Sequence, residues 1–295
     1  MPAIGLAVTL ITFGDHMIRW LYSHGWNAPA VLGILLCMAP YPEWLHICAW
    51  LYVSICFACA LGLAVHTLMR PQRMWIMSVV WPVTALYMGP FAVYMYRKSL
   101  PLLAMKTVSP QMKAIQEQFK DAPPTMIQNC IAVFHCGAGC TLGDIAAESM
   151  VPALGLTFAG EFGSKLVLDF VFAYILGIAF QYFTIAPMRG LSFGKGLVAA
   201  AKADTISIVL FEIGMFGWMA ITYFLLFPSP HLDHGMAVFW FMMQIAMIAG
   251  FFTALPANAS LIHKGWKEKM PEVDPQQMQR GMQAIEQDQR RRRAA

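Results

Sequence analysis

Long apolar runs separated by short polar segments dominate the chain from residue 44 onward. A transmembrane helix needs about 20 consecutive, mainly apolar residues. Six runs reach that length, at 44–69, 74–96, 126–154, 166–187, 203–227 and 237–262, and two shorter ones lie at 4–13 and 28–39. The pattern predicts an all-α fold, a polytopic membrane bundle of six clear transmembrane helices with one or two short N-terminal apolar helices. Within the second run, Pro82 and Pro90 predict a bend.

Polar segments divide this pattern into four predicted regions. An N-terminal membrane region covers residues 1–97, and a polar linker at 98–124 follows it with four lysines and a closing pair of prolines. A four-helix membrane domain covers 125–270. The tail at 271–295 ends in the basic run Arg290–Arg293.

Composition supports lipid as the solvent. The chain is 58% hydrophobic and 12% charged, whereas soluble domains carry about 25% charged residues. The net charge of +4 is modest, and we expect no nucleic-acid partner because folded basic surfaces and aromatic platforms are lacking. Lysines and arginines before residue 203 and after residue 262 place the C-terminus in the cytoplasm by the positive-inside rule. The seven cysteines, mostly within apolar runs, predict buried thiols instead of a disulfide framework.

The sharpest motif lies in the third long run and reads His-Cys-Gly-Ala-Gly-Cys from His135 to Cys140. On a helix, Cys136, Cys140, Asp144 and Glu148 follow one another at four-residue steps and form one polar stripe. Two thiols beside an imidazole suit a soft ion such as Cu(I), or Zn(II) if other ligands join. The alternative is helix packing, for which glycine and cysteine are common material in membranes.

Further ionisable and sulfur-containing residues lie in the following runs. Glu212 is flanked by apolar residues in the fifth run, where a charge at mid-membrane costs about 2.5–3.5 kcal/mol. It is a candidate to accept a proton or to pair with a cation. Thioethers suit Cu(I) and also fill gaps between helices. The candidate thioether ligands are Met215, Met243 and Met247, and Glu161, Lys165 and Asp169 share one face of the fourth run.

Three segments carry a resemblance to a known family. They are the His135–Asp144 motif, the segment 211–219 with Phe-Glu-Ile-Gly-Met and Trp-Met, and the segment 239–258 with Phe-Trp-Phe-Met-Met-Gln and Pro-Ala-Asn. Together they resemble the bacterial membrane family "domain of unknown function forty-three ninety-six" over residues 125–270. The resemblance implies a bacterial inner (cytoplasmic) membrane location and a weak association with copper proteins.

We therefore expect a multi-pass membrane protein that binds and translocates a soft transition-metal ion, copper first. His135, Cys136, Cys140, Met215, Met243 and Met247 would be the ligands, and Asp144, Glu148 and Glu212 would compensate charge or carry protons. The bilayer is the expected partner, with a metallochaperone or a larger membrane complex as further candidates. Two alternatives stay open: a membrane thiol-redox protein that uses Cys136 and Cys140, and an accessory or assembly subunit of a larger complex. An enzymatic role is the less favoured reading.

Overall fold

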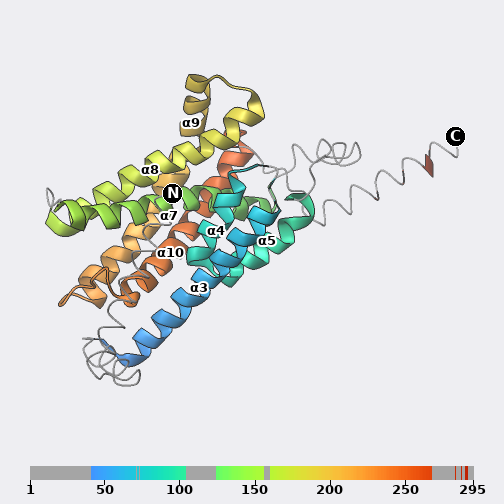
Figure 1. Cartoon of the computed structure of the whole chain (residues 1–295). Helices are drawn as coiled ribbons and strands as arrows, with labels where there is room; N and C mark the ends of the chain where they lie inside the picture. Colours follow the sequence, from blue (N-terminus) through green and yellow to red (C-terminus); the bar gives the residue numbers. More distant parts are fainter. Residues whose placement is uncertain are drawn as a thin grey trace. The chain divides into compact units, whose positions relative to one another are not determined.

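The computed structural model describes residues 41–70, 72, 74–103, 124–155 and 160–267, together with positions 283, 287, 290 and 291. All regular structure in these residues is helical (Figure 1), which confirms the all-α class. The chain divides into two compact units, residues 1–50 and 51–295. The short apolar runs at 4–13 and 28–39, and most of the linker and the tail, lie outside the described residues. The predicted domain boundaries remain predictions.

Five of the six predicted runs form helices that are long and apolar enough to cross a membrane. They are α3 (Glu43–Met69), α7 (Met126–Leu154), α8 (Gly160–Arg189), α9 (Phe193–Ile221) and α10 (Ala237–His263). The π-helical turn η1 (Thr222–Leu226) continues α9. Helix α9 begins ten residues before the predicted start at 203, because Gly194, Gly196 and Lys195 dilute the apolar signal there without ending the helix.

The sixth run, at 74–96, is two shorter helices, α4 (Met77–Met88) and α5 (Pro90–Leu103). The helix ends at Gly89, which has a φ of 51° and donates its N–H to the Ala85 carbonyl. Proline disfavours helical geometry in the residue before it, and glycine adopts positive φ without strain. Pro82 is accommodated inside α4, so the predicted bend is a full break located at the Gly89–Pro90 step.

Helix α7 is the central element of the second unit and packs against α4, α8, α9 and α10 (Figure 1). In its most apolar window 83% of the residues are buried, whereas the corresponding value for α8 and for α9 is 33%. Glycines permit this close packing, since a Cβ at Gly139 would lie 2.6 Å from the Gly177 Cα of α8. Small residues let membrane helices approach closely. The polar residues of α7 are therefore enclosed by neighbouring helices instead of lipid.

Candidate functional site

Four buried carboxylates from three helices meet beside α7. Asp144 and Glu148 come from α7, Asp169 from α8 and Glu212 from α9, and their exposed fractions lie between 1% and 6%. Asp144 interacts electrostatically with the other three, and Asp169 interacts with Glu148 and Glu212. We call this group the carboxylate cluster. The close α7–α8 contact explains the meeting, because it brings the α8 turn of Asp169 alongside the last turns of α7.

Most oxygens of the carboxylate cluster have no conventional hydrogen-bond partner among the described residues. This holds for both oxygens of Asp144, both oxygens of Glu212 and one oxygen of Asp169. The Cys140 thiol lies beside the Glu212 carboxylate, and a thiol is only a weak donor. Burying an ionised carboxylate without strong donors or a counter-charge is costly. The described residues therefore provide few of the hydrogen bonds that would stabilise four ionised carboxylates in this cluster.

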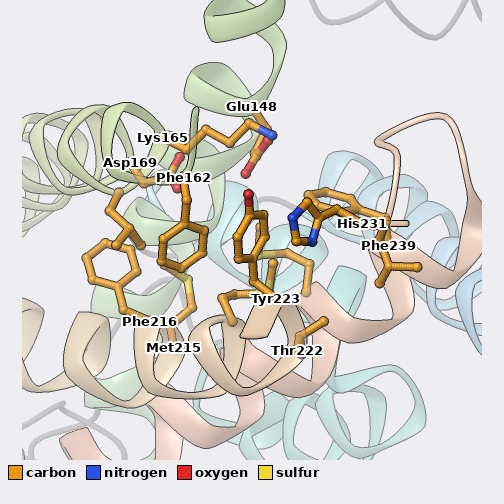
Figure 2. A pocket seen from close by; sticks show the side chains of 14 residues that line it. Glu148, Phe162, Lys165, Asp169, Met215, Phe216, Thr222, Tyr223, His231 and Phe239 are labelled. Atoms are coloured by element: carbon orange, nitrogen blue, oxygen red, sulfur yellow. The ribbon is translucent and has the colours of Figure 1, made fainter. Parts of the chain in front are cut away.

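Two basic side chains of the described part reach the carboxylate cluster. The Nε2 of His234 lies 2.5 Å from the Glu148 Oε2. Lys165 acts on Asp169, and its side chain extends toward Glu148 (Figure 2). Two cations at most face four carboxylates. Because like charges at close range cannot all ionise in a low dielectric, the cluster must hold protons or take up further cations.

A cavity of about 50 Å³ opens against this cluster (Figure 2). That volume holds roughly three to four waters, at ~15 Å³ of such volume for each. Glu148, Lys165 and Asp169 form its charged side, and most of the remaining lining is aromatic, methionine and leucine side chains. Thr222 and Tyr223 of η1 also line it. Single π-helical turns that interrupt or extend α-helices are frequent at functional sites.

The two cysteines of the motif lie deeper on the same stripe of α7. Cys136 and Cys140 are both fully buried and lie next to each other. The Tyr87 hydroxyl of α4 lies near both thiols and only 2.7 Å from where a Gly137 Cβ would be. Because Cys140 also lies against Glu212, the thiols continue the polar stripe from the carboxylate cluster into the bundle.

His135 is separated from the thiol pair. Its Nε2 is 2.6 Å from the Thr184 Oγ1 and its ring packs edge-on against Phe180, so the imidazole faces α8. Adjacent residues on a helix point about 100° apart, which is why proximity in sequence does not bring His135 to Cys136. Among the described residues, no three His, Cys, Asp or Glu side chains converge as metal ligands. The predicted ligand set is therefore not assembled as a ready-made metal centre in this conformation.

The predicted methionine ligands divide between two places. Met215 and Met243 line the cavity at the carboxylate cluster. Met247 instead lies 3.7 Å from the Thr141 hydroxyl, and it lines a separate, mainly apolar cavity of about 130 Å³, which Met243 also reaches. Met243 thus lies between the two cavities, and the three thioethers do not surround one point.

Sequence reasoning missed part of the carboxylate cluster's surroundings. It placed Lys165 and Asp169 on one helix face but did not connect them to Asp144 and Glu148. His234 lies in the polar loop before α10, and its ring reaches the buried Glu148. A loop residue carries no periodic signal, so only the fold reveals this pair. The side chain of Glu161 lies outside the described part.

Fold and site together define an integral membrane protein of the helical-bundle class with ionisable groups enclosed between its helices. Residues 127–267 match the sequence model of a family described as "Domain of unknown function (DUF4396)". The match agrees with the resemblance that the motifs indicated, and the matched residues contain the whole carboxylate cluster. No curated protein and no solved structure matches the chain.

Proposed function

We propose that this protein binds a cation at the carboxylate cluster and moves it through the helix bundle in exchange for protons. The observation that carries the proposal is the charge imbalance, four buried carboxylates against at most two positively charged side chains. Ionisable residues inside a membrane bundle commonly mark ion or proton pathways. A cation that enters replaces a proton on a carboxylate, so the buried charge stays constant while the ion passes.

A soft monovalent metal ion, Cu(I), is the cargo we would test first. Thioethers of Met215 and Met243 line the same cavity as Glu148 and Asp169, and the Cys140 thiol lies beside Glu212. Sulfur ligands favour soft ions. Since the described residues hold no preassembled metal centre, the ion would meet several weak sites in turn, which is what conduction requires.

The proposed path runs from the cavity at Glu148 through Asp144 and Glu212 to the thiols at Cys140 and Cys136. These groups lie at successive turns of α7, apart from Glu212, which α9 supplies. In the cell, we propose a bacterial inner membrane with the C-terminus in the cytoplasm, and a metallochaperone as donor or acceptor. The thiol-redox alternative is less well supported, because neither cysteine lines either of the two cavities described.

The test is transport by proteoliposomes that contain the full chain. An anaerobic Cu(I) gradient should drive copper uptake, measured by mass spectrometry, together with proton release into the opposite compartment, followed with a pH-sensitive dye. Glu212→Gln should abolish both signals, because it keeps the shape and removes the charge. Asp233→Asn is the matched control, since Asp233 lies in the exposed loop after η1.

The variants also separate the parts of the proposal. Copper uptake in wild type that survives Glu212→Gln would contradict the role of the carboxylate cluster. Loss of uptake in a Cys136→Ser, Cys140→Ser double variant, with proton binding retained, would assign the soft ion to the thiols. If wild type neither accumulates copper nor releases protons, copper is not the cargo.

A further inference from the structure

A second charged site lies at the end of α10, away from the carboxylate cluster. Helix α10 ends at a turn in which Gly265 has a φ of 67°, and the N–H groups of Trp266 and Lys267 both donate to the Leu261 carbonyl. A left-handed glycine just past a helix is a common way to reverse the chain. The turn directs the Lys267 side chain back into the bundle, where 2% of the residue is exposed.

The Lys267 ammonium is bound by oxygen atoms of two helices. It donates to the Asp204 Oδ1 of α9 and to the Asn258 Oδ1 of α10, both at 2.6 Å. The Asn258 amide nitrogen donates to the Ser207 Oγ at 2.6 Å, which holds the amide oxygen toward the ammonium. We call Lys267, Asp204, Asn258 and Ser207 the Lys267 site. The side chains of Lys267 and Asp204 are both fully buried.

One acceptor of the Lys267 site is not used by the ammonium. The Asp204 Oδ2 is buried and has no hydrogen-bond partner among the described residues. The site therefore offers more oxygen ligands than the lysine uses. Asp204 and Glu212 are eight residues apart on α9, about 12 Å along the helix, so this oxygen set is distinct from the carboxylate cluster.

Stability alone is a weak explanation for this arrangement. Replacing a buried ion pair with well-packed apolar side chains is often neutral or stabilising, and the apolar surroundings of α9 and α10 would suit such packing. Here the ammonium also comes from a turn beyond the helix, and not from a helix that packs in the bundle. The ammonium is linked to the chain through a flexible side chain, and its acceptors are the Asp204 and Asn258 oxygens.

We propose that Asp204 and Asn258 form a second cation site, specific for a small hard monovalent cation such as Na⁺, and that the Lys267 ammonium occupies it as a tethered competitor. Carboxylate and amide oxygens suit hard cations. One carboxylate against one positive charge leaves the site neutral with either occupant. This inference goes beyond the proposed function and does not depend on it, because it involves neither the carboxylate cluster nor a soft metal.

Covalent linkage to the chain favours occupancy of the site by the Lys267 ammonium over free sodium in the described conformation. A ligand linked to its site acts at a high effective concentration, so external sodium enters only when the turn at 264–267 moves away. Removal of the ammonium should then expose the site to sodium without any other change. The informative substitution is Lys267→Met, which keeps the side-chain length and removes the charge.

The experiment measures thermal stability and ²²Na⁺ binding of the purified full chain in sodium chloride and in choline chloride. Lys267→Met should lose stability in choline, regain it in sodium and bind about one sodium ion per chain. Wild type and the control Lys264→Met should show no sodium-dependent stability. In the Asp204→Asn, Lys267→Met double variant, which lacks both charges, sodium binding should disappear.

Equal stability of Lys267→Met in both salts, with no bound ²²Na⁺, would overturn the proposal and make Lys267 a structural anchor. The same conclusion follows if this variant folds in neither salt while the double variant folds in both. If neither variant folds, the wild-type protein can be tested by comparing the rates at which acetic anhydride acetylates its lysines in the two salts. Sodium should accelerate modification of Lys267 and leave Lys264 unchanged, and equal rates at Lys267 in both salts would refute the site.

Discussion

The carboxylate cluster and the Lys267 site are both buried and charged, and they differ in how their charge is balanced. At the Lys267 site, one ammonium meets one carboxylate and an oriented amide at 2.6 Å. At the carboxylate cluster, four carboxylates share two basic neighbours, and several oxygens lack partners among the described residues. The first region is neutral as folded. The carboxylate cluster needs bound protons or ions to balance its charge, because the side chains around it do not supply enough positive charge.

The largest expected effect is the loss of Asp204. Asp204→Asn leaves the Lys267 ammonium buried without its counter-ion, and breaking one partner of a buried pair costs about 3–5 kcal/mol. Denaturation of the detergent-solubilised protein should show this loss. The double variant with Lys267→Met should recover most of it. A decrease in the free energy of unfolding below about 1 kcal/mol would mean that the Lys267–Asp204 pair is solvated. The contrast between a balanced Lys267 site and an unbalanced carboxylate cluster would then be wrong.

Removing a charge from the carboxylate cluster should stabilise the protein, the opposite of the effect expected at Asp204. Asp144→Asn takes away one of four mutually repelling groups and keeps the side-chain shape. We expect no loss and a gain of about 1–4 kcal/mol at neutral pH, the range of one like-charge interaction at about 4 Å between a water-like and a protein-like dielectric. The same denaturation assay measures it. A clear destabilisation would show that Asp144 has a stabilising partner and that the cluster is balanced.

The smallest effect is expected at an exposed charge of the same turn as Lys267. The Lys264 Nζ lies 5.7 Å from the centre of the Trp266 ring, and an exposed cation–π contact contributes about 0.5–1 kcal/mol. Lys264→Met should therefore change stability by no more than that amount. If it destabilised the protein as much as Asp204→Asn, the turn as a whole, and not the buried ammonium, would explain the effect of Lys267.

The sequence predicted five of its six long runs as spans correctly, because length and apolar content largely define a transmembrane helix, whereas the run at 74–96 is broken at Gly89–Pro90. It also predicted that Asp144 and Glu148 lie on one stripe, since their spacing is local to one helix. It did not predict that Asp169 and Glu212 join them. That meeting depends on the register between helices, which is set by contacts such as Gly139 against Gly177.

Two residues show where local reasoning fails. His135 was grouped with the thiols because it precedes Cys136, but the helix turns it toward Thr184. Lys267 was counted among the charges that follow the last span, and a lysine in a polar segment usually reads as solvated. Gly265 was the available signal, because a glycine just past a helix end indicates a chain reversal. Only the fold shows that the reversal buries the ammonium.

The burial of α7 has a consequence for how the protein is made. Among the five described spans, α7 has the lowest mean hydropathy, 1.4, and the most buried window, 83%. A segment with several polar and ionisable residues partitions poorly into lipid by itself. During biosynthesis, α7 should therefore stay at the translocon until α8 has been synthesised. The two helices should then enter the bilayer together. Chains that end at residue 155 and continue into a polar extension long enough to bring α7 out of the ribosome should leave α7 uninserted, and chains that include α8 before the same extension should insert it.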